Sequence, residues 1–168
     1  MKNMSPVFER LEVNITNRLA RSGIVFLRVS VGIVFFWFGA LKFFPGLSPA
    51  QDLATRTINI LTFGLIPPDV SILLLATWEC LIGIGMILNV FMRTTLFLMF
   101  LQMLGTFTPL IFFPQEVFTR IPYAPTLEGQ YIIKNIVIVS AGLVIGATVR
   151  GGGVVADPDI VQKSGQRT

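Results

Sequence analysis

The run from Val70 to Leu88 constrains the fold most, because it is almost wholly apolar and holds one acid, Glu79, near its middle. At about 1.5 Å per residue, a helix of this length crosses a hydrocarbon layer of about 30 Å. An ionised carboxylate inside that layer costs several kcal/mol unless it is paired or hydrated. The run therefore predicts a membrane-spanning helix whose acid has partners on other helices.

Composition indicates that the rest of the chain belongs to the membrane as well. Of 168 residues, 53% are hydrophobic and 13% are charged, and the mean hydropathy is +0.75. The chain has one cysteine, Cys80, and no histidine, which excludes an intramolecular disulfide, a Cys-x-x-Cys redox pair and a His-ligated haem or zinc. A redox role would therefore rest on a bound organic cofactor or on a partner protein.

Four apolar runs are long enough to span a bilayer, so we expect an all-α protein built as a four-helix transmembrane bundle. They cover about residues 24–44, 70–88, 94–113 and 127–149. In the first outer loop, a short interfacial helix is expected from Ser48 onward, with Asp52 and Arg56 one turn apart. It serves either as a lid over a cavity or as a surface connector. Residues 114–125 are expected to form an irregular outer loop.

The chain divides into three parts. Residues 1–21 form either an amphipathic segment on the membrane surface or a disordered tail, residues 22–150 form the transmembrane domain, and residues 151–168 form a flexible polar tail. Basic residues concentrate in the terminal parts and in the 89–93 turn, which predicts that both termini are cytoplasmic. The net charge of +4 therefore reflects orientation, and no nucleic-acid partner is predicted.

Polar residues inside the spans define the candidate site. Judged by depth, side chains from all four spans can converge near the midplane, and we expect them to form a buried polar network made of Arg28, Glu79, Gln102 and Lys134. Lys42, at the outer end of the first span, either turns inward or extends to the headgroups. The candidate ligand-binding residues are the four residues of this network, Lys42, and Asn135, which follows Lys134 in the sequence. The full set is Arg28, Lys42, Glu79, Gln102, Lys134 and Asn135. No catalytic residue or metal site is predicted.

Three bases against one acid inside the spans leave spare positive charge. This excess suits an anionic small molecule or a quinone head held by lysine and amide donors, unless Glu116 or Glu128 folds in to neutralise it. Two other interpretations remain open. Glu79 and Lys134 relay protons or ions in an oligomeric carrier or channel, or the charges only set helix register in a structural scaffold.

Small residues and a proline predict local packing. Gly32 and Gly39 lie on the same helix face as Arg28 and Lys42, so that face is expected to pack closely on another helix. Pro109 removes a donor from the third span and frees a carbonyl near Gly105, which neighbouring hydroxyl groups can satisfy.

Three short patterns, in this order and spacing, resemble the DoxX family of small four-helix membrane proteins. They are Arg28…Gly32…Gly39-x-x-Lys42 in the first span, Glu79 with Gly83 and Gly85 in the second, and the segment from Leu127 to Asn135 at the start of the last. The resemblance implies a multi-pass protein of the bacterial cytoplasmic (inner) membrane. The family includes a quinone-linked thiosulfate oxidoreductase subunit and components of oxidative-stress complexes, and many members have no assigned activity.

The resemblance also implies an accessory subunit, not an enzyme on its own, that works with a membrane or redox partner protein or as a homo-oligomer. Related families that exchange disulfides use cysteine pairs, and this chain departs from them because Cys80 is its one cysteine. Thiol chemistry is therefore not carried over, and a quinone remains the cofactor that the resemblance suggests.

Overall fold

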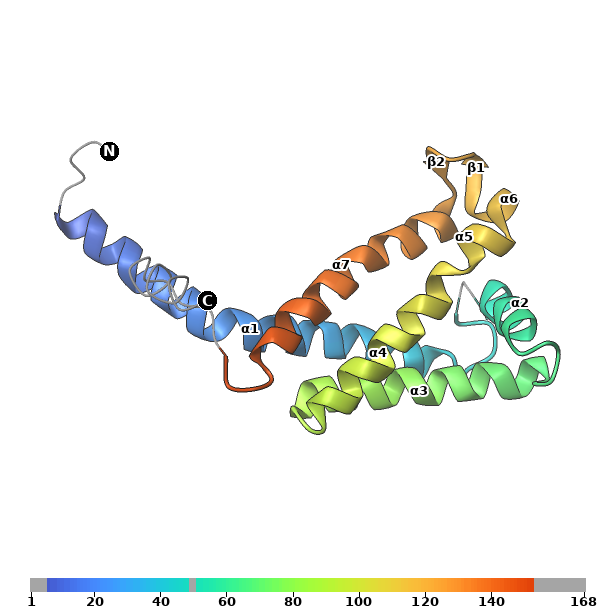
Figure 1. Cartoon of the computed structure of the whole chain (residues 1–168), viewed down its shortest axis with the longest axis horizontal. Coiled ribbons are helices and arrows are strands. Elements are labelled where there is room, and N and C mark those ends of the chain that lie inside the picture. Colours follow the sequence, from blue (N-terminus) through green and yellow to red (C-terminus); the bar gives the residue numbers. More distant parts are fainter. Residues whose placement is uncertain (1–5, 49–50, 153–168) are drawn as a thin grey trace, which may run out of the picture.

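The computed structural model describes residues 6–48 and 51–152, and within them the chain is almost entirely helical. Four long helices are joined by shorter elements (Figure 1). The long helices are α1 (Pro6–Leu41), α3 (Pro68–Leu88), α4 (Met92–Phe107) and α7 (Leu127–Thr148). The segments long and apolar enough to cross a membrane are Ser22–Leu41, Pro68–Leu88, Met92–Phe112 and Leu127–Thr148. The prediction of an all-α bundle with four spans is confirmed, and its boundaries agree within a few residues.

Helix α1 begins well before the first span. It continues without a break from Pro6 through the first span, and in Figure 1 this part extends beyond the other helices. No proline interrupts the sequence from residue 7 to residue 44, and Gly23 alone does not end the helix. The apolar residues Leu11 and Ile15 are exposed on it. Most of the tail predicted at residues 151–168 lies outside the described residues.

Helix α1 packs most extensively on α3, and glycines make this contact close. A Cβ atom added at Gly39 would lie 2.8 Å from Glu79 Cβ, and one added at Gly83 would lie 2.5 Å from the backbone nitrogen of Phe36. Such distances leave no room for a side chain, so the predicted packing role of Gly39 is confirmed. The close approach brings the C-terminal end of α1 against the middle of α3.

The third span bends where Pro109 interrupts it. Helix α4 ends at Phe107, and α5 (Pro109–Phe112) continues the span. The hydroxyl of Thr108 donates a hydrogen bond to the Gly105 carbonyl oxygen at 2.7 Å. This bond confirms the prediction that a neighbouring hydroxyl satisfies the carbonyl freed by the proline.

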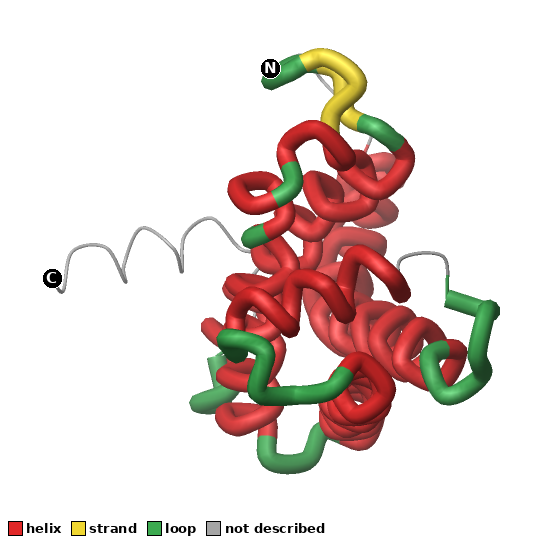
Figure 2. Tube along the Cα trace, turned by 90° about the vertical axis from the view of Figure 1, so that its right-hand side faces the viewer, coloured by secondary structure: helices red, strands yellow, loops and turns green. Residues whose placement is uncertain are grey.

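The connection after this span is more regular than predicted. Helix α6 (Pro114–Val117) leads into the antiparallel strands β1 (Phe118–Arg120) and β2 (Ala124–Pro125). Figure 2 shows this hairpin at one end of the helical bundle. The short helix expected in the first outer loop is present as α2 (Gln51–Leu61), which packs on α3 and also contacts α4 and α5.

Candidate functional site

Glu79 lies near the middle of α3 and is buried, with 8% of its surface exposed. Its Oε2 atom forms an ion pair with Lys42 Nζ at 2.6 Å. Its Oε1 atom accepts a hydrogen bond from Gln102 Nε2 at 2.8 Å. These three side chains, from the end of α1, from α3 and from α4, are called the Glu79 cluster below. They confirm the prediction that the buried acid has partners on other helices.

Lys42 follows the last residue of α1 and turns inward. Side chains of a helix tilt toward its N-terminus, so a lysine at the C-terminal end is directed back along the helix and into the bundle. Its Nζ also donates to the Phe38 carbonyl oxygen at 3.2 Å, one of the carbonyls that the end of a helix leaves without an amide partner. The lysine therefore stabilises the end of α1 and the Glu79 carboxylate together.

Gln102 leaves hydrogen-bonding capacity unused. Its Nε2 atom binds Glu79, but its Oε1 atom is buried and has no hydrogen-bond partner among the described residues. Lys42 uses two of its three N–H donors, on Glu79 and Phe38. As far as the described part of the chain shows, the cluster thus contains one buried acceptor without a partner, on Gln102, and one N–H of Lys42 that binds neither Glu79 nor Phe38.

Arg28 and Lys134 do not join this cluster, so the expected four-residue network is wrong in these two members. Arg28 Nη1 donates to the carbonyl oxygens of Met86 and Ile87, the latter at 3.1 Å. These carbonyls belong to the last turn of α3, where backbone acceptors lack helical partners and attract cations. The arginine therefore joins α1 to the C-terminal end of α3, away from the Glu79 cluster in the middle of that helix.

Lys134 is exposed on α7, with Nζ 5.9 Å from the centre of the Tyr131 ring. Asn135 beside it is half-buried. Helix α7 turns its small residues, such as Gly142, toward the bundle, and this rotation directs Lys134 away from Glu79. The sequence pattern did not give the rotation of α7 about its axis.

One contact near the cluster was not expected. The indole nitrogen of Trp78 donates to the Leu98 carbonyl oxygen at 3.2 Å and so joins α3 to α4 next to Glu79. The available signal was that a buried indole N–H needs an acceptor.

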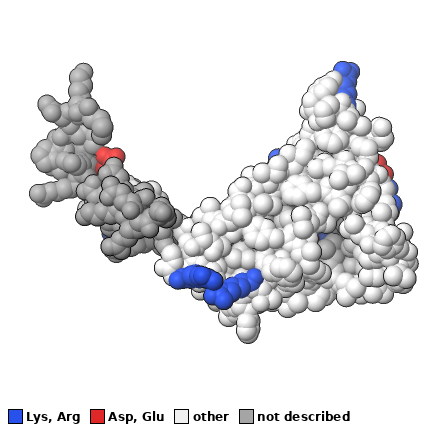
Figure 3. All heavy atoms as spheres, viewed as in Figure 1, with Lys and Arg blue, Asp and Glu red and all other residues white. Residues whose placement is uncertain are grey.

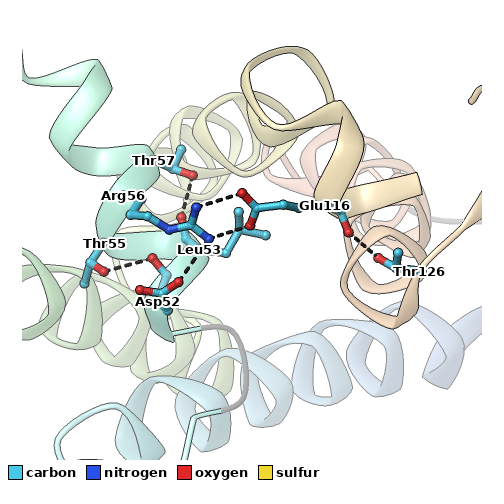
Figure 4. A network of polar contacts seen from close by, with 7 residues as sticks. All are labelled: Asp52, Leu53, Thr55, Arg56, Thr57, Glu116 and Thr126. Carbon is cyan, nitrogen blue, oxygen red and sulfur yellow. Dashed lines mark hydrogen bonds and ion pairs between the residues drawn. The ribbon is translucent and has the colours of Figure 1, made fainter. Parts of the chain in front are cut away.

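A second charged cluster lies between α2 and α6 (Figure 4). Arg56 donates to both carboxylate oxygens of Glu116, with Nη1 2.7 Å from Oε1, and its Nη2 lies 3.0 Å from Asp52 Oδ2. We call Asp52, Arg56 and Glu116 the outer cluster. The hydrogen bonds from Arg56 hold the pKa of the Glu116 carboxyl below its ordinary value. Glu116 therefore pairs with Arg56 and does not neutralise the bases inside the spans.

The outer cluster also connects to the start of α7. Thr126 donates its hydroxyl to the Glu116 carbonyl oxygen at 2.8 Å and accepts from the Gly129 backbone N–H at 3.2 Å, which caps the helix. These contacts, some of them drawn in Figure 4, tie α2, α6 and α7 together at one end of the bundle.

The fold and the cluster together define the class: a multi-pass α-helical membrane protein with an ion pair buried between its spans. The chain belongs to the DoxX family, because the sequence model of that family, described as DoxX, matches residues 23–113, more than half of the chain. The matched region contains Lys42, Glu79 and Gln102, the whole Glu79 cluster. No curated protein and no solved structure matches the chain.

Proposed function

We propose that the Glu79 cluster binds the head group of a quinone-type molecule within the bilayer, and that the protein is an accessory subunit of a membrane redox or oxidative-stress system. The observation that carries this proposal is the buried Oε1 atom of Gln102, which has no partner among the described residues. A buried acceptor without a partner costs about 1–3 kcal/mol. A ligand that donates a hydrogen bond there would recover this energy.

The hydrogen-bonding groups of the cluster match both redox forms of such a head. A quinol hydroxyl can donate to Gln102 Oε1, and a quinone carbonyl can accept from the remaining N–H of Lys42. The charge of Lys42 is already balanced by Glu79 at 2.6 Å, so the cluster is close to neutral. This balance favours a neutral quinone head over the anionic small molecule that the sequence also allowed.

The proton or ion relay through Glu79 and Lys134 receives less support. Lys134 is exposed on α7 and contacts Tyr131, not the carboxylate. A carrier would need another group to pass the proton onward. Proton flux in liposomes that Glu79→Gln abolishes would nevertheless favour the carrier over the quinone site.

Quinone binding is tested by titrating the purified protein with a short-chain quinone and following tryptophan fluorescence, because Trp78 lies beside Glu79 on α3. Gln102→Leu removes the unpaired acceptor, and one lost hydrogen bond of about 1–1.5 kcal/mol corresponds to about 5- to 13-fold weaker binding. Gln130→Leu, at an exposed position of α7, is the matched control and should bind as the wild type does. Equal affinity of all three proteins contradicts the proposal.

A second pair of substitutions separates binding from a purely structural role. Replacing both Lys42 and Glu79 by methionine removes the ion pair without leaving a buried charge, and such replacements are often neutral for stability. We expect the double variant to fold and to lose quinone binding. A folded double variant that still binds quinone as the wild type does would leave the cluster with a structural role alone.

The accessory role requires a partner protein. Isolation of the tagged full-length chain from its own membranes in mild detergent, followed by identification of co-purifying proteins, should find a redox enzyme. A chain that purifies alone or only with copies of itself contradicts this part of the proposal.

A further inference from the structure

A groove of about 400 Å³ lies between α4 and α7, where α4 begins and α7 ends. Leu96, Phe97 and Phe100 of α4 contribute apolar surface to it, and Ala147 of α7 lines it from the other side. None of its lining residues belongs to the Glu79 cluster or to the outer cluster. The groove is therefore a separate feature of the bundle.

Two glycines of α7 show why the groove opens at this end. At Gly142 an added Cβ atom would collide with the Met99 side chain, so the two helices touch there. One turn later, at Gly146, the nearest atom to an added Cβ is Leu96 Cδ1 at 3.7 Å, an ordinary contact distance. The helices thus separate toward the beginning of α4, and the small residues of α7 leave the space unfilled.

Arg93 and Arg150 stand at the mouth of this groove. Arg93 lies in the first turn of α4 and Arg150 just after the end of α7, and the two antiparallel helices bring them to the same end. Both are exposed, no acidic residue lines the groove, and among the described residues neither forms an ion pair. Figure 3 shows basic side chains at this end without acidic ones beside them. Arg28, in contrast, is bonded to the carbonyls of α3.

We propose that this groove binds an anionic phospholipid, with one acyl chain along the apolar wall and the phosphate between Arg93 and Arg150. Both the charge of the two arginines and their position at the end of an apolar groove favour this molecule. An apolar groove between two spans, with two arginines at its mouth that form no ion pair within residues 6–48 and 51–152, matches a molecule with an apolar chain and an anionic head. A free anion would use only the arginines, and a neutral lipid only the apolar wall.

The experiment compares phosphatidylglycerol with phosphatidylcholine of the same acyl chains, binding to the delipidated full-length protein in detergent, by native mass spectrometry. Each arginine near a lipid surface contributes about a fivefold gain in affinity for an anionic head, so Arg93→Gln with Arg150→Gln should weaken phosphatidylglycerol binding about 30-fold. Phosphatidylcholine binding should change little. Arg93→Lys with Arg150→Lys keeps both charges and should retain most of the preference.

Two controls test whether the groove itself is responsible. Arg18→Gln with Arg120→Gln removes the same formal charge at exposed positions that do not line the groove, and should leave the preference intact. Ala147→Trp fills the groove and should weaken binding of both lipids. An unchanged preference in the Arg93 and Arg150 double glutamine variant overturns the proposal, as does an equal loss in the control pair. Full competition by inorganic phosphate, together with no effect of Ala147→Trp, would show a simple anion site and overturn it as well.

Discussion

The Glu79 cluster and the outer cluster use the same chemistry in different surroundings. In each, a basic residue binds a carboxylate on another helix at a similar distance, 2.6 Å for Lys42 Nζ to Glu79 and 2.7 Å for Arg56 Nη1 to Glu116. Their exposure differs: the paired side chains are 11% and 10% exposed in the Glu79 cluster, and 41% and 45% in the outer cluster. Bond geometry alone therefore does not distinguish them.

The difference in exposure decides how much each ion pair contributes to the stability of the folded protein. A buried charge that loses its partner has no water to replace it, whereas an exposed charge is hydrated and screened by salt. The Glu79 cluster should therefore govern whether the bundle folds. The outer cluster should govern how firmly α2 is held against α6.

The largest effect is expected from Glu79→Ala. This substitution leaves the Lys42 ammonium buried without its carboxylate, which costs about 3–5 kcal/mol. Thermal unfolding of the purified protein in detergent measures the loss. The control is Glu128→Ala, an exposed acid in the first turn of α7, which should unfold within a degree or two of the wild type. Equal unfolding temperatures for all three proteins would remove the contrast.

A smaller effect is expected from Gln102→Leu. The variant removes the donor to Glu79 Oε1, and a hydrogen bond to a charged group is worth about 1.5–3 kcal/mol. It also removes the unpaired Oε1 atom, whose burial costs about 1–3 kcal/mol, so the two effects largely offset and the net loss should be about 1 kcal/mol or less. Denaturant unfolding, compared with the exposed control Gln130→Leu, measures this value. A more stable variant would mean that the unpaired oxygen costs more than the amide donor contributes.

The outer cluster should respond to acid. Arg56 lowers the folded-state pKa of Glu116 below the ordinary 4.5. The stability that the Arg56–Glu116 pair gives to the folded state is therefore fully present above pH 4.5 and is lost as the pH falls through the lowered pKa. The protection of α2 amides from hydrogen exchange, measured against an unstructured peptide at the same pH, should therefore fall below about pH 4.5, with little change in the unfolding of the bundle. Glu116→Gln should show faster exchange at neutral pH and no further acid effect in this range. Identical acid responses of wild type and variant would assign the effect to another group.

The smallest effect is expected from salt. Raising the ionic strength from about 0.1 M to 1 M shortens the screening length from about 10 Å to 3 Å, which weakens exposed pairs more than buried ones. Exchange in α2 should increase modestly, and exchange around Glu79 should stay the same. Equal sensitivity of the two regions would mean that water reaches the Glu79 cluster.

Much of the fold was predictable because it follows from one-dimensional patterns. Span length comes from runs of apolar residues, and the need of Glu79 for a partner comes from the cost of a charge in hydrocarbon. The bond from Thr108 to Gly105 follows from Pro109 in the same way, because a proline frees the carbonyl four residues before it. These inferences required no knowledge of how the helices cross.

The partners of the charges were only partly predictable. Gln102 was assigned correctly, and Lys42 had an inward orientation as one of two alternatives. Arg28 and Lys134 were placed wrongly: Arg28 bonds to the last turn of α3, about two turns beyond Glu79, and Lys134 is exposed on α7. Local periodicity gives a residue's position along a helix, but the rotation of that helix in the bundle depends on side chains far away in sequence.

The amino-acid sequence by itself determined four spans, a buried acid that needs a base, and a glycine-lined face on the first span. The tertiary structure decided that Lys42 is that base, that Arg28 binds the end of α3, and that Arg93 and Arg150 meet at one groove. The need of Glu79 for a partner could be inferred from the sequence because the cost of burying a charge depends on the apolar residues around it in the same span. The choice of partner depends on helix crossings, which the packing of glycines such as Gly39 and Gly83 sets.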